Sequence, residues 1–169
     1  MNCETSDASS VGFFDVSRPW SIQNHRTEKY NLTTPGPHPV WQKEPHPHHV
    51  ISHGRYLVVP DLGADLIRVY ETNREPDGIV THVDTLTPVN ATRGSGPRHG
   101  AFATIGGKTY FYTVNDLGNS ISGYSVNYGS TLGLTQLFTI SSQRLAGVSN
   151  GTKVVEIVVS VCKILLLTT

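Results

Sequence analysis

Two stretches of the chain carry the aromatic and aliphatic alternation that favours β-strands over helices. They are GRYLVVPDLGADLIRVY (residues 54–70) and GKTYFYTVNDLGNSISGYSV (residues 107–126), and Asp-Leu-Gly interrupts each of them. Val and Tyr favour strands, whereas Asp and Gly favour tight turns. No long apolar stripe at helical spacing competes with this pattern. The sequence therefore predicts two strand–turn–strand units.

The two units belong to a repeat. Asp61 and Asp116, which open the two Asp-Leu-Gly turns, are 55 residues apart. The tail CKILLLTT aligns with GKTYFYTV at the same separation, and VGFFDV (residues 11–16) resembles ISGYSV (residues 121–126) at twice that separation. Short antiparallel strands that repeat about every 50 residues are typical of β-propeller blades.

The repeat also predicts the domain organisation. We expect an all-β fold, a partial β-propeller with about two complete blades plus parts of two others, because propellers have about four to eight blades. Residues 1–169 are expected to be a fragment of one propeller domain. The fragment would begin in a closing strand of one blade and end in the first strand of another, with a disordered start over residues 1–9.

Composition and charge exclude several classes of partner. Thirteen Lys and Arg residues balance thirteen Asp and Glu residues, and no basic stripe indicates nucleic-acid binding. The apolar tail contains Glu156 and Lys163 and is too short and interrupted to span a membrane. The N-terminus lacks the features of a signal peptide, which favours the cytoplasm. Cys3 and Cys162 are consistent with either a disulfide or two free thiols. The sequence does not indicate the oligomeric state.

Candidate chemistry gathers in KEPHPHHV (residues 43–50), with its histidines at 46, 48 and 49. In an extended segment, His46 and His48 would face one way and His49 the other. The surrounding sequence supplies no further metal ligands, so we expect no metal and no cofactor. A neutral imidazole suits general acid–base chemistry. A solvated loop histidine is the alternative.

An arginine and two aspartates form the second group of candidates. Arg98 follows two glycines in GSGPRHG, and its guanidinium group suits a carboxylate or phosphate. The alternative is a structural arginine that donates to turn carbonyls. Asp61 and Asp116 share a repeat position, which indicates turn formation, and Arg68 is expected to pair with a neighbouring strand. For Asp116, turn formation and catalysis both stay open.

The motifs PHPHHV, LVVPDLGADLIRVY, GSGPRHGAF and YFYTVNDLGNSISGY together resemble, in order and spacing, the seven-bladed lactonase propeller family. That family includes bacterial 6-phosphogluconolactonases and fungal carboxy-cis,cis-muconate lactonizing enzymes (cycloisomerases), and this chain looks closest to the fungal members over residues 10–169. The resemblance implies His48, Arg98 and Asp116 as catalytic residues, with His46 and His99 as supporting substrate-binding residues. Asp116 stands where the cycloisomerases have Glu, and their second Arg would directly follow Thr169.

The implied substrate is a small anionic lactone or its open-chain carboxylate. In hydrolysis, His48 would activate water while Arg98 holds the anionic group. In cycloisomerisation, His48 would transfer the proton at the carbon adjacent to the closing lactone ring, while Arg98 orients a carboxylate. A non-enzymatic binding platform and a decayed or truncated gene product are the alternatives. We expect little or no turnover from the 169-residue chain itself.

Overall fold

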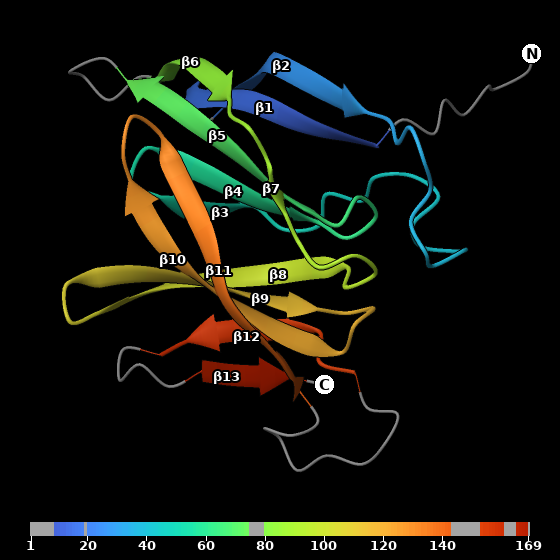
Figure 1. Cartoon of the computed structure of the whole chain (residues 1–169). Coiled ribbons are helices and arrows are strands. Elements are labelled where there is room, and N and C mark those ends of the chain that lie inside the picture. The colour runs from blue at the N-terminus through green and yellow to red at the C-terminus, as the bar shows by residue number, and fades with distance from the viewer. Residues whose placement is uncertain (1–8, 19, 75–79, 143–152, 161–164, 169) are drawn as a thin grey trace, which may run out of the picture.

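The chain folds into short β-strands joined by turns. The computed structural model describes residues 9–18, 20–74, 80–142, 153–160 and 165–168 (Figure 1). Within these ranges the strands are β1 (Ser9–Arg18), β2 (Ser21–Tyr30), β3 (Ile51–His53), β4 (Tyr56–Asp61), β5 (Leu66–Arg74), β6 (Val80–Thr85), β7 (Val89–Asn90), β8 (Pro97–Ile105), β9 (Lys108–Asn115), β10 (Ser120–Tyr128), β11 (Leu132–Ser141), β12 (Glu156–Val159) and β13 (Leu165–Thr168).

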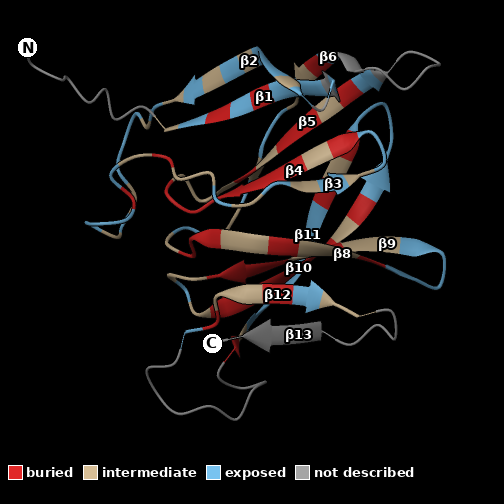
Figure 2. Ribbon diagram, turned by 180° about the vertical axis from the view of Figure 1, so that it is seen from behind, coloured by how far each residue is buried: buried red, intermediate tan, exposed pale blue. Residues whose placement is uncertain are grey.

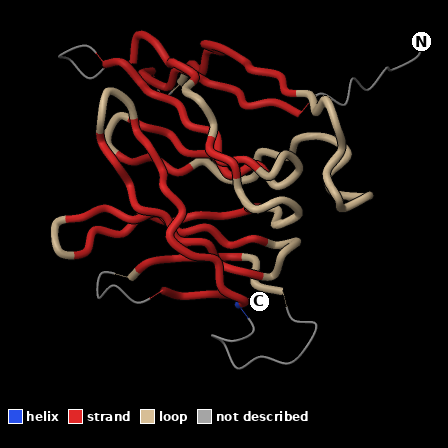
Figure 3. The backbone as a smooth tube through the Cα atoms, in the orientation of Figure 1, coloured by secondary structure: helices blue, strands red, loops and turns tan. Residues whose placement is uncertain are grey.

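The strands form four antiparallel sheets that follow one another along the molecule (Figures 1 and 3). Blade 1 is β1–β2, blade 2 is β3–β4–β5–β6 with β7 added to β5, blade 3 is β8–β9–β10–β11, and blade 4 is β12–β13. This arrangement confirms the predicted all-β partial propeller with two complete blades and parts of two others. Within the described part of the chain, no helix is long and apolar enough to cross a membrane.

The hydrophobic core lies between the blades, because each central strand buries side chains on both of its faces. In β4, Val58 packs toward blade 3 and the next residue, Val59, packs toward blade 1. Burial is concentrated in the middle strands and falls toward the outer ones (Figure 2). Full burial of a Val, Ile or Phe side chain stabilises the fold by about 1.5–3 kcal/mol. Contacts between neighbouring blades therefore provide most of the hydrophobic stabilisation.

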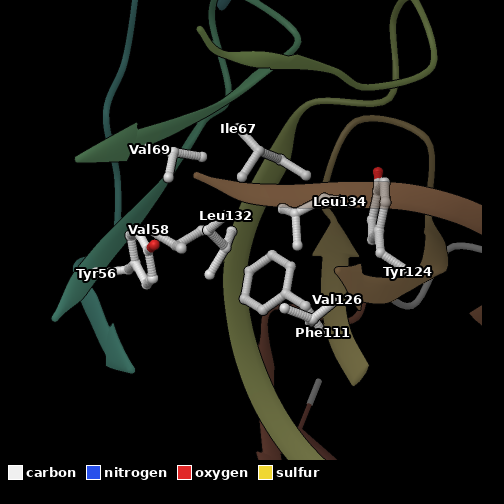
Figure 4. Close-up of a cluster of buried hydrophobic side chains, with 9 residues drawn as sticks. All are labelled: Tyr56, Val58, Ile67, Val69, Phe111, Tyr124, Val126, Leu132 and Leu134. Carbon is white, nitrogen blue, oxygen red and sulfur yellow. The ribbon is translucent and has the colours of Figure 1, made fainter. Parts of the chain in front are cut away.

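Three clusters join the four blades in series. Figure 4 shows the cluster between blades 2 and 3, where side chains of the two sheets interdigitate: Tyr56, Val58, Ile67, Val69, Phe111, Tyr124, Val126, Leu132 and Leu134. A second cluster joins blades 1 and 2 and contains Val11, Phe13, Val59, Tyr70 and Val83. A third joins blades 3 and 4 and contains Val114, Ile121, Val154 and Ile157.

The first strands of blades 2, 3 and 4 lie side by side. Strand β8 contacts both β3 and β12 (Figure 2). The His53 ring at the end of β3 stacks on Phe102 of β8, with ring centroids 4.4 Å apart. Because β3, β8 and β12 start at the same end of the stack, residues far apart in sequence meet where these strands begin.

The structural repeat differs by one residue from the predicted one. In blade 2 the hairpin closes with Asp61 opposite Leu66, and in blade 3 it closes with Asn115 opposite Ser120. The left-handed turn residues agree with this register, with φ of 52° at Asp65 and 42° at Asn119. The predicted equivalence of Asp61 and Asp116 is therefore wrong. The hairpins match at a separation of 54 residues, and Asn115 is the counterpart of Asp61.

The two ends of the chain also differ in detail from expectation. The separation of 110 between β1 and β10 holds, because the pairing shifts at the same place in both strands, between Phe13 and Phe14 opposite β2 and between Gly123 and Tyr124 opposite β11. The tail supplies the first two strands of blade 4 rather than only the first, since β12 precedes β13. Residues 1–8 and both cysteines lie outside the described residues, and Ser9 opens β1.

Candidate active site

The segments that lead into blades 2 and 3 begin in the same way. Pro47 bridges to Asp61 in blade 2, and Pro97 pairs with Asn115 in blade 3. Beyond each proline the pairing shifts by one residue, to Ile51–Val58 in blade 2 and Ala101–Tyr112 in blade 3. Such a shift is a β-bulge, which re-aims the side chains beside it. The dipeptide at 48–49 therefore occupies the same place in blade 2 as the dipeptide at 98–99 in blade 3.

The bulge changes which way the histidines face. His48 and His49 both contact His99, with ring centroids 5.0 Å and 4.8 Å apart. His49 Nδ1 also accepts a hydrogen bond from the backbone N–H of Gly100 at 3.3 Å. The prediction that His49 faces away from its neighbour is wrong, because strict alternation requires a regular strand and this segment is not one.

Arg98 connects the two blades and the start of the next. Its Nε donates to His48 Nε2 at 3.1 Å, and its Nη1 donates to the Val155 carbonyl at 3.0 Å. Asp116 Oδ2 lies 3.8 Å from Arg98 Nε. Arg98 therefore donates to a carbonyl, as in the structural alternative, and it also faces the candidate catalytic histidine.

Two residues that the sequence analysis missed complete the cluster. Glu156, the first residue of β12, lies with its Oε2 2.6 Å from His99 Nδ1. Lys153 Nζ lies 3.2 Å from Asp116 Oδ1. No local signal in the sequence marks these two residues. In the structure they lie at the start of a third inner strand, where residues 154–157 repeat the buried and half-buried pattern of residues 97–100.

The predicted candidates separate into two groups. The structure brings together His48, Arg98, His99 and Asp116. His46 lies at the blade 2 turn, where its N–H donates to Asp61 Oδ1 at 2.7 Å and its carbonyl accepts from Leu62. His46 is therefore not part of the proposed site.

Asp61 is a turn residue, as predicted. Its Oδ1 accepts hydrogen bonds from the backbone N–H groups of His46 and Ala64, and its Oδ2 pairs with Arg68 Nη2 at 2.6 Å. The pairing of Arg68 with the neighbouring strand is also confirmed. Asp116, by contrast, uses its backbone for the turn, where its carbonyl accepts the Asn119 N–H, while its carboxylate faces Arg98 and Lys153.

The surroundings adjust the charge states of the cluster. Burial lowers the pKa of His48 below its ordinary value, and the nearby Arg98 and His99 lower it further. Burial and His99 likewise lower the pKa of His49. Burial alone would raise the pKa of Glu156, but hydrogen bonds from the Ile157 N–H and His99 outweigh it, so the net pKa is lowered. At neutral pH the cluster therefore presents a neutral His48 base beside cationic Arg98 and anionic Glu156.

The cluster combines a base, a cation and carboxylates. It can accept a proton at an imidazole and bind an anionic group at a guanidinium. Among the described residues, no group of three His, Cys, Asp or Glu side chains is arranged to hold a metal ion.

Comparison with known proteins agrees with the fold. Residues 7–166 match the family described as lactonase, 7-bladed β-propeller. The chain belongs to this lactonase family. It is also 32% identical over 117 residues to a protein of Arthroderma benhamiae named "Probable 6-phosphogluconolactonase". That match covers 67% of this chain and 28% of the relative.

Solved structures extend the comparison. The periplasmic gluconolactonase of Pseudomonas aeruginosa superposes with a TM-score of 0.68 at 25% identity, covering 91% of this lactonase-family chain and 41% of that protein. A protein from Lactobacillus plantarum superposes with a TM-score of 0.66 at 18% identity, covering 95% of this chain and 50% of the other, and shows the fold alone. The chain thus spans half or less of the length of these relatives.

Proposed function

We propose that this protein opens the ring of a small anionic lactone, with 6-phosphogluconolactone as the preferred substrate class. The observation that carries the proposal is the hydrogen bond of 3.1 Å between Arg98 Nε and His48 Nε2, which joins an anion-binding group to a neutral base. Similarity to a fungal protein named as a 6-phosphogluconolactonase supports the substrate class. The site would consist of His48, Arg98 and Asp116, at the starts of β3 and β8 and in the turn after β9.

Each group has a defined task in the proposed hydrolysis. The phosphate or carboxylate of the substrate binds Arg98, whose Nε–H then leaves His48 Nε2. His48 Nε2 takes a proton from water, and the water oxygen bonds to the lactone carbonyl carbon. The ring C–O bond breaks, and the proton held by His48 passes to the leaving oxygen. Asp116 pairs with Arg98 and Lys153 through its two carboxylate oxygens and partly neutralises these two cations.

The first test is binding of the product, 6-phosphogluconate, to the 169-residue chain, measured by calorimetry. Because the chain spans 28% of the curated relative, binding is measured before turnover. We expect Arg98→Ala to weaken binding about tenfold or more, since hydrogen bonds to charged groups contribute about 1.5–3 kcal/mol. Arg55→Ala is the matched control, because Arg55 is exposed and pairs with Glu71 away from the cluster.

The second test is lactone hydrolysis above the spontaneous rate, compared for the parent chain and His48→Asn, with exposed His25→Asn as control. Any such hydrolysis should be lost in His48→Asn alone. Equal affinity of the parent chain and Arg98→Ala for 6-phosphogluconate contradicts the proposal. A preference for a muconate-derived lactone would favour cycloisomerisation, and binding without turnover would favour a binding platform.

A further inference from the structure

Three hydrogen bonds run from Arg98 through two histidines to a carboxylate. Arg98 Nε lies 3.1 Å from His48 Nε2, and His48 Nδ1 lies 3.2 Å from His99 Nε2. His99 Nδ1 lies 2.6 Å from Glu156 Oε2. Every ring nitrogen of His48 and His99 therefore takes part in a hydrogen bond. This series of hydrogen bonds connects blade 2, blade 3 and blade 4.

The two ends of this hydrogen-bond series, Arg98 and Glu156, determine where the protons lie. A guanidinium group only donates, so His48 Nε2 must accept, and a neutral His48 then carries its proton on Nδ1. That proton is donated to His99 Nε2, which leaves the His99 proton on Nδ1. Glu156 accepts it, as an ionised carboxylate must. All three hydrogen bonds point the same way, from Arg98 toward Glu156.

Glu156 is itself held in place. Its Oε1 accepts the backbone N–H of Ile157 at 3.0 Å, which fixes the carboxylate at the start of β12. The His99 ring lies between the rings of His48 and His49, and its side chain is 17% exposed. A carboxylate that orients an imidazole and stabilises its charged form is a recurring device in hydrolases.

We propose that Glu156 is a positioning residue that acts through His99 to hold His48 in the Nδ1–H tautomer. This inference rests on the proposed function for the role of His48 as a base. The tautomer leaves the lone pair on Nε2, where Arg98 lies and where the substrate would arrive. When His48 gains a proton at Nε2, the positive charge is stabilised through Nδ1–H and His99 by the Glu156 carboxylate. His99 is thereby a positioning residue rather than the substrate-binding residue that the sequence predicted.

The proposal is tested by long-range ¹H–¹⁵N NMR of the imidazole rings of the 169-residue chain at neutral pH, without substrate. We expect His48 and His99 both to be Nδ1–H tautomers. Glu156→Gln keeps an accepting oxygen without the charge and should reduce the Nδ1–H population of both rings. Glu156→Ala should reduce it further.

The exposed pair His82–Asp84, with His82 Nε2 2.9 Å from Asp84 Oδ1, supplies the matched control. Asp84→Asn should change the His82 signals and leave His48 and His99 unchanged. Glu156→Gln is isosteric at a side chain that is 38% exposed, so the fold should persist, and unchanged His82 signals verify this. An Nε2–H tautomer at His48 in the parent chain, or an unchanged Nδ1–H tautomer in Glu156→Ala, overturns the proposal.

A kinetic readout separates positioning from binding. In any measurable hydrolysis, Glu156→Gln should lower kcat about 10–100-fold with little change in KM, as expected for a group that orients another. The acid limb of the pH profile should move to lower pH, because the charged form of His48 loses support. The other charged or titratable groups that face His48 and His99, namely Arg98, Asp116 and His49, remain in place. Failure of lactone binding with the tautomers intact would contradict the proposed function alone.

Discussion

The turns of blades 2 and 3 share the tripeptide Asp-Leu-Gly but use its aspartate differently. Asp61 is fully buried at the end of β4, whereas Asp116 lies one place beyond the end of β9 and is 18% exposed. Register is fixed by the buried residue that closes each hairpin and by the left-handed residue four places later. A shared tripeptide therefore does not identify a shared position, and a shift of one residue moves a carboxylate from the core to the site.

The residues that replace the buried carboxylate explain how this shift is tolerated. In blade 2, Asp61 pairs with Arg68. In blade 3 the equivalent pair is Asn115 and Ser122, which bond through Asn115 Nδ2 and Ser122 Oγ at 2.9 Å. Blade 2 thus closes its hairpin with a charged pair and blade 3 with a neutral one. The neutral arrangement leaves the Asp116 carboxylate available to Arg98 and Lys153.

The largest expected effect tests the charged hairpin. Asp61→Ala should reduce the free energy of unfolding by about 3–5 kcal/mol, because it leaves the largely buried Arg68 without its partner. Urea unfolding of the 169-residue chain measures this change. A cost no larger than that of Asp116→Ala would contradict the assignment of Asp61 to the core.

The neutral hairpin should be less costly to break. Asn115→Ala removes hydrogen bonds to Thr113, Ser120 and Ser122 and should cost about 1–3 kcal/mol, the usual penalty for unsatisfied buried polar groups. The same urea titration measures it. If Asn115→Ala proved as harmless as a surface substitution, Asn115 would not be the counterpart of Asp61.

Asp116→Asn should affect ligand affinity more than stability. Its ion pairs are partly solvated, so the free energy of unfolding should fall by about 1 kcal/mol or less. Removing the carboxylate leaves Arg98 and Lys153 more attractive to an anion, and 6-phosphogluconate should bind a few-fold more tightly, about 1 kcal/mol or less. Calorimetry checks the affinity, and weaker binding would instead indicate that Asp116 holds the cations in place.

The smallest expected effect concerns pH. His48, His49 and His53 have pKa values lowered in the folded chain, chiefly by burial, so the unfolded chain binds protons first as the pH falls. Stability should therefore be constant above the unfolded pKa of about 6.5 and decline below it, levelling off once the pH has passed the folded pKa values. His48→Asn should remove a share of about a few tenths of a kcal/mol, since solvent screens this site. An unchanged pH dependence in that variant would contradict the lowered pKa.

The sequence predicted the middle strands of each blade well. In β4 and β9 the run of aliphatic and aromatic residues predicted a strand, and Val58 and Phe111 within these runs are fully buried. These features are local, and strand composition and turn chemistry are sufficient to predict them. The candidates His48 and Arg98, which the structure joins directly, came instead from the resemblance to the lactonase family.

The rest of the cluster depends on contacts that no local pattern encodes. Glu156 meets His99 across 57 residues of sequence, and only the stacking of blades 3 and 4 brings them together. The bulge after Pro47 reverses the side to which His49 points, and a single sequence does not reveal a one-residue shift in pairing. The matching Asp-Leu-Gly tripeptides concealed the true hairpin register for the same reason.

The bulges at the starts of β3 and β8 have a consequence for how such a site can change. His48-His49 and Arg98-His99 occupy equivalent two-residue positions in blades 2 and 3. None of these four side chains belongs to a hydrophobic cluster that joins the blades. The residues at these positions can therefore be exchanged with little cost to folding, while the proline and the bulge fix the direction in which their side chains point. One scaffold can in this way present a base, a guanidinium group or a carboxylate to the same point by changing two residues in each blade.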